Sequence, residues 1–246
     1  MFSIMGLRLE KGQIFHLRTP KLTNKEDQAI YEVSCPARAK VRTDNSTTKS
    51  WAVFLDRDGV LNELVFYKDQ GRVGSPLTAK ELRVTRHASE TVKELRGLGA
   101  KVIVISNQPG VAKKQISYNE LQRMNQKIKG QLAKTGTRVD AEYYCLHHPN
   151  ALIRKYKVVC DCRKPGPGLL KKAAKDHNID LAESYFVGDS LVDVKAGRAA
   201  GVQTILLGTM TDLLNRVIEQ ENSTPDYMVG KLSDVRPLIQ KMRSKK

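Results

Sequence analysis

Two aspartates, Asp56 and Asp58, follow directly after the apolar run 52–55, which has the length and composition of a buried strand. Two carboxylates in such a place are costly to bury unless a cation compensates them, and Mg²⁺ prefers hard oxygen ligands of this kind. The following Gly59 permits a tight turn, and Asp-Gly is also a common turn dipeptide. The pair therefore predicts either a magnesium site or an ordinary surface turn.

A second set of polar residues follows the β-branched run 101–105. Ser106, Asn107 and Gln108 stand there, followed by Pro109. A hydroxyl, an amide and the backbone N–H groups after them can hold a phosphate, although a polar loop explains the same residues. Taken alone, these residues therefore indicate either a phosphate site or an ordinary polar loop.

Two further segments carry charges at comparable places. Arg163 and Lys164 precede a glycine-containing turn and a helix, so they either neutralise a phosphoryl group or form an exposed basic loop. Asp189 follows the apolar run 185–187, where it can be another Mg²⁺ ligand. Asp193 falls in the first turn of the next helix, a position that the helix dipole favours by itself. Because parallel strands present their carboxyl ends at one edge of a sheet, we expect these groups to share one site.

Three of the four cysteines lie within 18 residues, and a histidine stands among them. The pattern is Cys-x-His, then Cys-x-Cys, and its members are Cys145, His147, Cys160 and Cys162. Three thiolates and one imidazole suit tetrahedral Zn²⁺, and a set without an open position predicts a structural ion. The zinc loop 145–162 leads into Arg163 and Lys164, so we expect zinc to position these cations. His148 is interpreted as a neighbour of the site, and Cys35 as a bystander.

Short apolar runs alternate with amphipathic stretches of helical length after residue 51. The expected strands are 52–55, 101–105, 141–145, 185–187, 202–207 and 227–229, and the expected helices are 88–98, 117 to about 134, 168–177, 191–200 and a closing helix capped by Ser233. Ser117 and Glu120 form a capping-box pattern. This alternation predicts a three-layer α/β/α, Rossmann-like fold with a parallel sheet.

The length and charge set limits on the organisation of the chain. It has 246 residues, 40% of them hydrophobic, and 42 Lys and Arg against 26 Asp and Glu give a net charge of +16. No apolar run is long enough to span a membrane, and the start lacks a secretory signal, so we expect a cytoplasmic protein. No spare apolar helix stripe is evident, so we also expect a monomer. Residues 1–50 are expected to be a flexible extension of unknown role, and residues 51–246 the folded domain.

Four motifs taken together resemble the haloacid dehalogenase (HAD) superfamily of phosphatases, over about residues 51–240. They are FLDRDGVLN, SNQPGVA, CLHHP followed by CDCRKP, and VGDSLVD. The zinc loop makes the chain similar to the branch that contains D,D-heptose 1,7-bisphosphate phosphatases and histidinol phosphatases, which lack a large cap domain. Bacterial heptose enzymes usually carry Thr in place of Ser106 and Lys in place of Ser190. The first change keeps the hydroxyl, and the second removes a cation near the phosphate.

The resemblance implies a role for each motif. Asp56 attacks phosphorus and becomes an aspartyl-phosphate, while Asp58 protonates the leaving alkoxide and then deprotonates water. Ser106 and Lys164 hold the phosphoryl oxygens. Mg²⁺ is held by Asp56, the backbone carbonyl of Asp58 and Asp189, with Asp193 in support. Substrate-binding residues are expected at Arg57, Leu64, Val65, Phe66, Tyr67, Asn107, Gln108, Pro109, Arg163 and Ser190.

The resemblance also implies a substrate, a small phosphorylated metabolite. We expect Mg²⁺-dependent removal of the 7-phosphate from D-glycero-D-manno-heptose 1,7-bisphosphate, with histidinol phosphate as the alternative. The +16 charge raises a third possibility, a nucleic-acid 3′-phosphatase, but aromatic residues make up only 6% of the chain and no aromatic-rich basic groove is evident. A partner of this last kind is therefore not favoured.

Overall fold

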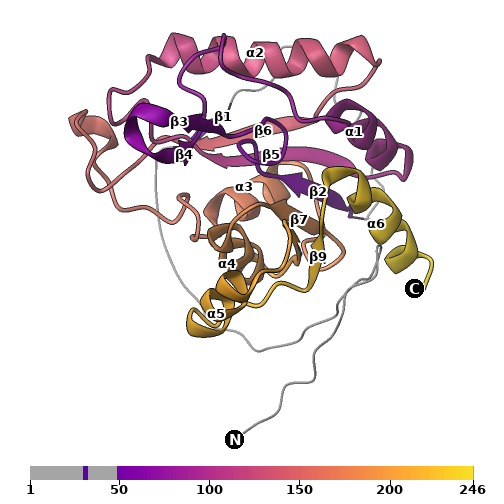
Figure 1. The fold of residues 1–246 in the computed structure, drawn as a ribbon. Helices are drawn as coiled ribbons and strands as arrows, with labels where there is room; N and C mark the ends of the chain where they lie inside the picture. Colours follow the sequence, from indigo (N-terminus) through magenta and orange to yellow (C-terminus); the bar gives the residue numbers. More distant parts are fainter. Residues whose placement is uncertain (1–29, 33–48, 246) are drawn as a thin grey trace, which may run out of the picture.

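A seven-stranded sheet forms the centre of the protein (Figure 1). The computed structural model describes residues 30–32 and 49–245. The strand order is β1-β6-β5-β2-β7-β8-β9, and all neighbours are parallel except β1, which is antiparallel to β6. The strands are β1 (Ile30–Glu32), β2 (Ala52–Leu55), β5 (Lys101–Asn107), β6 (Ala141–Cys145), β7 (Tyr185–Gly188), β8 (Gln203–Leu207) and β9 (Tyr227–Val229).

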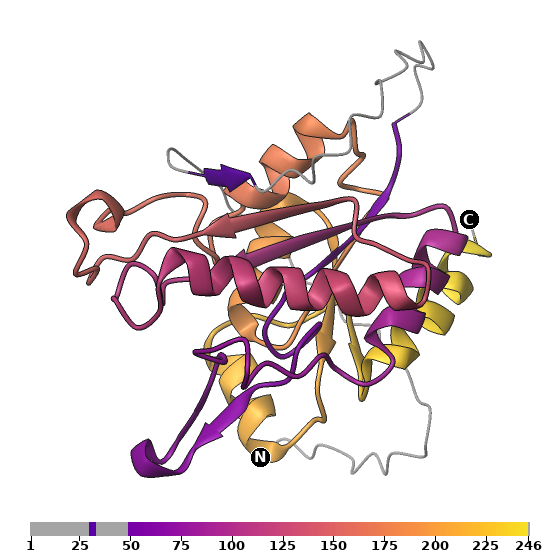
Figure 2. The same ribbon diagram turned by 90° about the horizontal axis from the view of Figure 1, so that it is seen from above.

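Helices cover both faces of this sheet, as Figures 1 and 2 show. One face packs against α1 (Ala88–Gly97), α2 (Tyr118–Lys134) and α6 (Val235–Arg243). The other face packs against α3 (Gly168–Asp176) and α4 (Leu191–Ala200), and α5 (Asp212–Gln220) packs beside α4. Short 3₁₀ helices span Lys68–Gln70, Arg154–Tyr156 and Leu232–Asp234. The predicted three-layer α/β/α architecture is confirmed.

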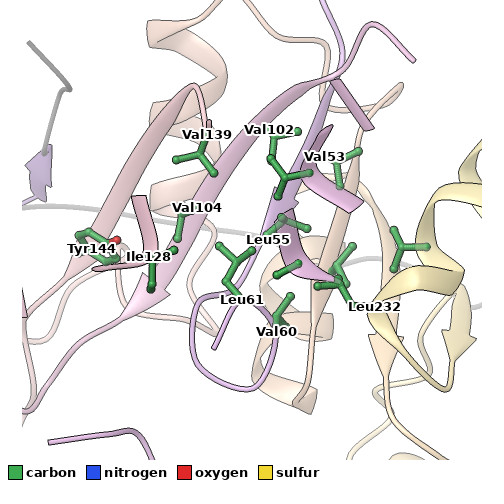
Figure 3. Packing of buried hydrophobic residues seen from close by; sticks show 14 of the residues in the cluster. Val53, Leu55, Val60, Leu61, Val102, Val104, Ile128, Val139, Tyr144 and Leu232 are labelled. Carbon is green, nitrogen blue, oxygen red and sulfur yellow. The ribbon is translucent and has the colours of Figure 1, made fainter. Parts of the chain in front are cut away.

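Strand β2 is buried along its whole length because each side chain faces one of two helical layers. Val53 and Leu55 join the core under α1, α2 and α6 (Figure 3), and Ala52 and Phe54 join the core under α3 and α4. A strand buried on both faces reads as a continuous apolar run. The central position of β2 places the residues that follow it, from Asp56 onward, in the middle of the sheet edge.

Helix boundaries follow the predicted caps in one case and depart from them in another. The Ser117 side chain accepts a hydrogen bond from the Glu120 N–H at 3.0 Å, as predicted for the start of α2. The prediction that Ser233 caps the last helix is wrong. Ser233 lies inside the 3₁₀ turn Leu232–Asp234, and α6 begins only at Val235. The buried side chain of Leu232 anchors this additional turn in the core.

The sequence did not predict several elements. β3 (Val65–Tyr67) and β4 (Arg72–Gly74) form a hairpin between β2 and α1, and it projects from the rest of the domain (Figure 2). No larger insertion separates β2 from α1 in the described chain, which agrees with the absence of a large cap domain. β1 lies within the expected extension, and Ile30 pairs with Cys145. Residues 1–29 and 33–48 of that extension, Cys35 among them, lie outside the described residues.

Candidate active site

Lys164 lies between Asp56, which follows β2, and Asp193, in the first turn of α4. Its Nζ is 2.9 Å from Asp56 Oδ1 and 2.6 Å from Asp193 Oδ1, and it donates to the Ile105 carbonyl at 3.2 Å. Only 3% of Lys164 is exposed. Burial opposes the charge of Lys164, but the carboxylates of Asp193 and Asp56 raise its pKa above the ordinary value. A charged lysine is therefore fixed against the predicted nucleophile.

Asp56, Asp189 and Asp193 form an acidic cluster whose carboxylate oxygens lie within 4.8 Å of one another. Burial raises the pKa of Asp56 to about 6, against the lowering effect of Lys164. Burial also raises the pKa of Asp189 to about 7, with a further contribution from the charges of Asp56 and Asp193. One lysine leaves this cluster with excess negative charge. The donor set therefore fits Mg²⁺, which prefers carboxylate oxygens.

Gly59 makes the approach of Asp189 possible. Its φ of +82° lies in the left-handed region, and a Cβ at this position would stand 1.8 Å from Asp189 Oδ2. The Gly59 backbone, in the turn after β2, therefore packs directly against the Asp189 side chain, which follows β7. This close contact explains why the FLDRDGVLN motif has a glycine at position 59.

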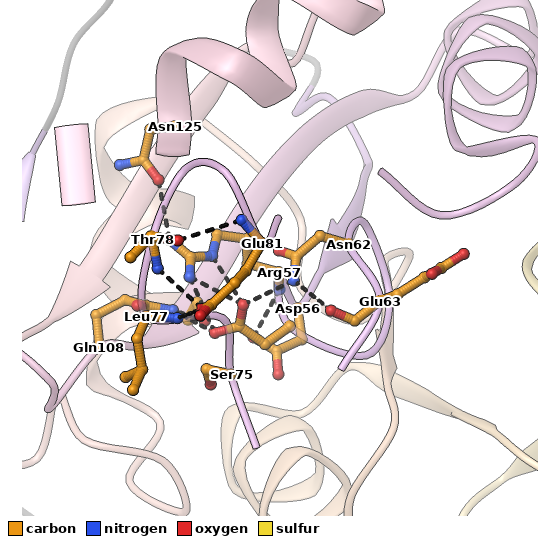
Figure 4. Close-up of polar contacts among 12 residues, drawn as sticks. Asp56, Arg57, Asn62, Glu63, Ser75, Leu77, Thr78, Glu81, Gln108 and Asn125 are labelled. Atoms are coloured by element: carbon orange, nitrogen blue, oxygen red, sulfur yellow. Dashed lines mark hydrogen bonds and ion pairs between the residues drawn. The ribbon is translucent and has the colours of Figure 1, made fainter. Parts of the chain in front are cut away.

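The carboxylate of Asp58 accepts hydrogen bonds from Arg57, Asn62 and Gln108, the three donors that Figure 4 labels. Arg57 Nε and Nη2 donate to Asp58 Oδ1 at 3.1 and 2.9 Å, and Asn62 Nδ2 donates to the same oxygen at 3.0 Å. Gln108 Nε2 donates to Oδ2 at 2.7 Å. Burial alone would raise the pKa of Asp58, but the Arg57 charge and these hydrogen bonds lower it overall.

The residues that follow β5 link the two halves of the site. Gln108 Nε2 also donates to Ser106 Oγ at 3.2 Å. Asn107 holds the backbone of Lys164 from both sides, since its Nδ2 donates to the Lys164 carbonyl and its Oδ1 accepts from the Lys164 N–H, each at 3.0 Å. The side chains of Asn107 and Gln108 therefore orient Lys164 and Asp58.

Ser190 and Asp193 form the capping box of α4. Asp193 Oδ2 accepts from the backbone N–H of Ser190 at 3.2 Å and also contacts its hydroxyl. The other oxygen, Oδ1, faces Lys164. Asp193 thus orders the start of α4 and holds Lys164, while its expected support of Mg²⁺ stays a prediction.

The predicted substrate-binding residues fall into two groups. The Arg57 side chain is fully buried against Asp58 and Asn125, so it is closed to a ligand in this structure. Gln108 is also buried, and it is bonded to Asp58. The others are exposed or half-buried: Leu64, Val65, Phe66 and Tyr67 on or beside the hairpin, Asn107 at the end of β5, Pro109 and Arg163 on loops, and Ser190 at the N-cap of α4. Tyr67 lies 3.2 Å from Glu81 Oε2, and Arg163 donates to the His147 carbonyl at 3.3 Å. Ligand contact by this second group stays a prediction.

Two hollows adjoin these loops. One of about 260 Å³ is lined by Leu64, Val65, Glu81 and neighbouring residues at the base of the hairpin. Another of about 490 Å³ lies between the loop after β5 and the zinc loop, with Lys114 and Lys155 among its lining. Asp56 and Lys164 line neither hollow, so the candidate active site is located by the acidic cluster and not by a hollow.

The four predicted zinc ligands converge. The Sγ atoms of Cys145, Cys160 and Cys162 are 3.0–3.7 Å apart, and His147 Nδ1 is 3.2–3.9 Å from them. Four ligands around Zn²⁺ with Zn–S bonds of 2.3 Å would place sulfurs about 3.8 Å apart, close to these separations. The residues therefore fit a tetrahedral ion with His147 bound through Nδ1.

Contacts among the three thiols shift their pKa values in opposite directions. Hydrogen bonds with Cys145 and Cys162 lower the pKa of Cys160, whereas those with Cys160 and Cys145 raise the pKa of Cys145 and Cys162, respectively. A zinc ion would bind all three cysteines as thiolates. Cys162 stands two residues before Lys164, and the expectation that zinc positions this lysine stays a prediction.

Two asparagines of this site were absent from the sequence analysis. Asn62 donates to Asp58, and Asn125 of α2 accepts from Arg57 Nη1 at 3.0 Å. Asn62 stood inside the FLDRDGVLN motif, so a local signal existed. Asn125 is 68 residues from Arg57 and gave no such signal.

Comparisons with known proteins agree with this geometry. The HAD-hydrolase-like family model matches residues 161–235. The chain is 35% identical to a D-glycero-beta-D-manno-heptose-1,7-bisphosphate 7-phosphatase of Salmonella typhi and 33% identical to that of Escherichia coli K12, each over 78% of this chain and 96% and 95% of the relative.

A solved structure gives the same result. The D,D-heptose 1,7-bisphosphate phosphatase of B. bronchiseptica, complexed with magnesium and phosphate, is 27% identical with a TM-score of 0.63, over 78% of this chain and 99% of that one. No helix in the described part of this chain is long and apolar enough to cross a membrane. By its sequence and its fold the chain belongs to the HAD-like phosphatases, in the family of the D-glycero-beta-D-manno-heptose-1,7-bisphosphate 7-phosphatases.

Proposed function

We propose that this protein removes the 7-phosphate from D-glycero-D-manno-heptose 1,7-bisphosphate, with Mg²⁺ as its catalytic cofactor and Zn²⁺ as a structural ion. The observation that carries the proposal is the buried Lys164, fixed 2.9 Å from Asp56 beside an acidic cluster at the carboxyl edge of the sheet. The match to this chain spans nearly the whole length of the relatives named as heptose bisphosphate phosphatases.

In the first step Asp56 attacks phosphorus. An Asp56 carboxylate oxygen forms a bond to phosphorus, and the bond from phosphorus to the sugar oxygen breaks with its electron pair remaining on that oxygen. Asp58 gives its proton to the departing oxygen. Lys164 and Ser106 hold the phosphoryl oxygens, and the positive charge of Lys164 stabilises the charge that they carry in the transition state.

In the second step Asp58 takes a proton from water, which attacks the aspartyl-phosphate and releases phosphate and free Asp56. Asp56, the backbone carbonyl of Asp58 and Asp189 would hold Mg²⁺, whose positive charge would offset the repulsion between a carboxylate and a phosphate dianion. Asp193 keeps Lys164 in place through both steps. The fixed hydrogen bonds of Asn107 to the Lys164 backbone serve the same end.

The test is phosphate release from a panel of substrates, measured with Mg²⁺ present and with zinc content determined alongside. The panel contains both anomers of the heptose bisphosphate, histidinol phosphate, p-nitrophenyl phosphate and an oligonucleotide 3′-phosphate. We expect the heptose bisphosphate to have the highest kcat/KM and Asp56→Asn to abolish release. Equal release by the wild type and Asp56→Asn contradicts the mechanism, and a preference for histidinol phosphate contradicts the substrate.

A monomer in the cytoplasm completes the proposal. The expectation of a monomer comes from the absence of a spare apolar helix stripe in the sequence. Size-exclusion chromatography with light scattering at several protein concentrations tests it, because a dimer would give twice the mass of 27.6 kDa.

A further inference from the structure

Asn125 places a polar side chain in a buried face of α2 that is otherwise apolar. The other buried residues of this helix are Leu121, Met124, Ile128 and Leu132. Asn125 is 1% exposed, and its Oδ1 accepts a hydrogen bond from Arg57 Nη1 at 3.0 Å. A buried amide at a position suited to an apolar side chain costs free energy unless its hydrogen bonds compensate for the lost contact with water.

Arg57 connects this amide to Asp58. The guanidinium is fully buried, and its Nε and Nη2 donate to Asp58 Oδ1 while Nη2 also lies 3.2 Å from Oδ2. The planar fork of arginine fixes a carboxylate in two directions, which a lysine cannot do. The remaining edge of the fork, at Nη1, is the one that Asn125 holds. The plane of the guanidinium, and with it the plane of the Asp58 carboxylate, is therefore set from α2.

We propose that Asn125 and Arg57 are positioning residues that orient the Asp58 carboxyl group for proton transfer to the leaving group. The inference rests on the role proposed above for Asp58. Without Asn125, the buried Arg57 Nη1 loses its acceptor, so the guanidinium turns toward another acceptor and takes the carboxyl group with it. A general acid acts only within hydrogen-bond reach of the atom that it protonates, so a small rotation of Asp58 removes its contribution.

The leaving group separates this role from a merely structural one. A sugar oxygen that departs as an alkoxide is strongly basic and needs the Asp58 proton as its bond to phosphorus breaks. The p-nitrophenolate ion is stable and departs without a proton. The ratio kcat/KM includes the steps up to the transfer of phosphorus to Asp56, so loss of proton transfer lowers kcat/KM for the sugar substrate and leaves that for p-nitrophenyl phosphate nearly unchanged.

The experiment compares Asn125→Ala and Arg57→Lys with wild type and with Gln126→Ala, an exposed position of the same helix. For each protein the quantity is kcat/KM with heptose 1,7-bisphosphate divided by kcat/KM with p-nitrophenyl phosphate. We expect this quotient to fall at least about tenfold in both test variants, since general acid catalysis contributes about 10²–10⁴-fold, and to stay at the wild-type value in Gln126→Ala.

Equal losses on the two substrates, or no loss on either, overturn the inference, because a loosened fold lowers both rates together. If Asn125→Ala does not fold, as shown by its circular dichroism, Arg57→Lys decides the matter alone, since it keeps the buried charge. Failure of the proposed function looks different: the wild type then releases no phosphate from the heptose bisphosphate, or Asp56→Asn releases as much as the wild type.

Discussion

Replacement of Gly59 by alanine should disable the magnesium site without removing any of its ligands. A Cβ at Gly59 would lie 1.8 Å from Asp189 Oδ2 and 2.4 Å from its Cγ. Carbon and oxygen ordinarily approach no closer than roughly 3.3 Å, so Asp189 or the turn after β2 must move by about 1.5 Å. Magnesium requires ligand distances near 2.0–2.1 Å in almost regular octahedral geometry, and a shift of this size takes Asp189 out of the coordination sphere.

The expected loss is large because positioning is the main contribution of the site. A misplacement of about 1 Å costs on the order of 100-fold in rate, so we expect kcat/KM of Gly59→Ala to fall by about that factor, with a higher Mg²⁺ concentration for half-maximal activity. The assay is hydrolysis of p-nitrophenyl phosphate over a Mg²⁺ titration. Zinc content should be unchanged, because the zinc ligands belong to the loop 145–162.

Gly201→Ala is the matched control. Gly201 has a φ of +86°, close to that of Gly59, but a Cβ there would meet no atom within 4 Å. Both variants place alanine in the left-handed region, which costs about 1–2 kcal/mol and lowers Tm by roughly 2–8 °C in a chain of this size. Only Gly59→Ala should lose magnesium affinity. Wild-type Mg²⁺ dependence in Gly59→Ala, or the same loss of activity in Gly201→Ala, would refute the reasoning.

Three further predictions concern pH, zinc and helix capping. The raised pKa values of Asp56, about 6, and Asp189, about 7, make the folded protein bind protons more tightly than the unfolded chain, so these groups lower the stability of the metal-free protein as pH rises from about 4 to 7. The increase in Tm on adding Mg²⁺ should accordingly be larger at pH 8 than at pH 5.5. An increase that is independent of pH would contradict this prediction. Cys162→Ser should lose bound zinc, measured by elemental analysis, and lower Tm by several degrees, while Cys35→Ser should keep both at wild-type values; full zinc content in Cys162→Ser would exclude the proposed ligand set. Ser117→Ala should reduce the free energy of unfolding by about 1 kcal/mol in a urea titration without a change in activity, because α2 loses the cap at Glu120 N–H, and an unchanged midpoint would show that the cap contributes nothing.

The parts of the site that sequence analysis placed correctly are those fixed by strand topology and by ligand chemistry. Continuous apolar runs indicate parallel strands that are buried on both faces. The carboxyl ends of such strands lie at one edge of the sheet, so Asp56 and Asp189 were expected to lie close together, as they do. Cys145, Cys160 and Cys162 were identified from their spacing and their shared preference for zinc. These inferences need no knowledge of how side chains pack between distant elements.

Other elements had weak or overlooked signals. Helix α5 was not predicted, although Leu214, Val217 and Ile218 have helical spacing and Thr211 caps the helix by accepting from the Leu214 N–H at 3.1 Å. The β3–β4 hairpin has three-residue strands, which are too short to show an alternation, and their residues are half-buried or exposed rather than buried. Its position is fixed by tertiary contacts such as Tyr67 with Glu81.

Arg57 shows most clearly why residue type and spacing do not settle the role of a charged group. A cation between two aspartates in a motif suggests contact with an anionic ligand, and the resemblance implied the same. A buried guanidinium, however, is tolerated only where acceptors surround it, and Asp58 and Asn125 supply them at 2.9–3.0 Å. The second acceptor lies on α2, beyond the reach of any local pattern. In this structure the arginine therefore binds the carboxylate beside it, and we expect its effect to be seen in the dependence of the rate on the leaving group.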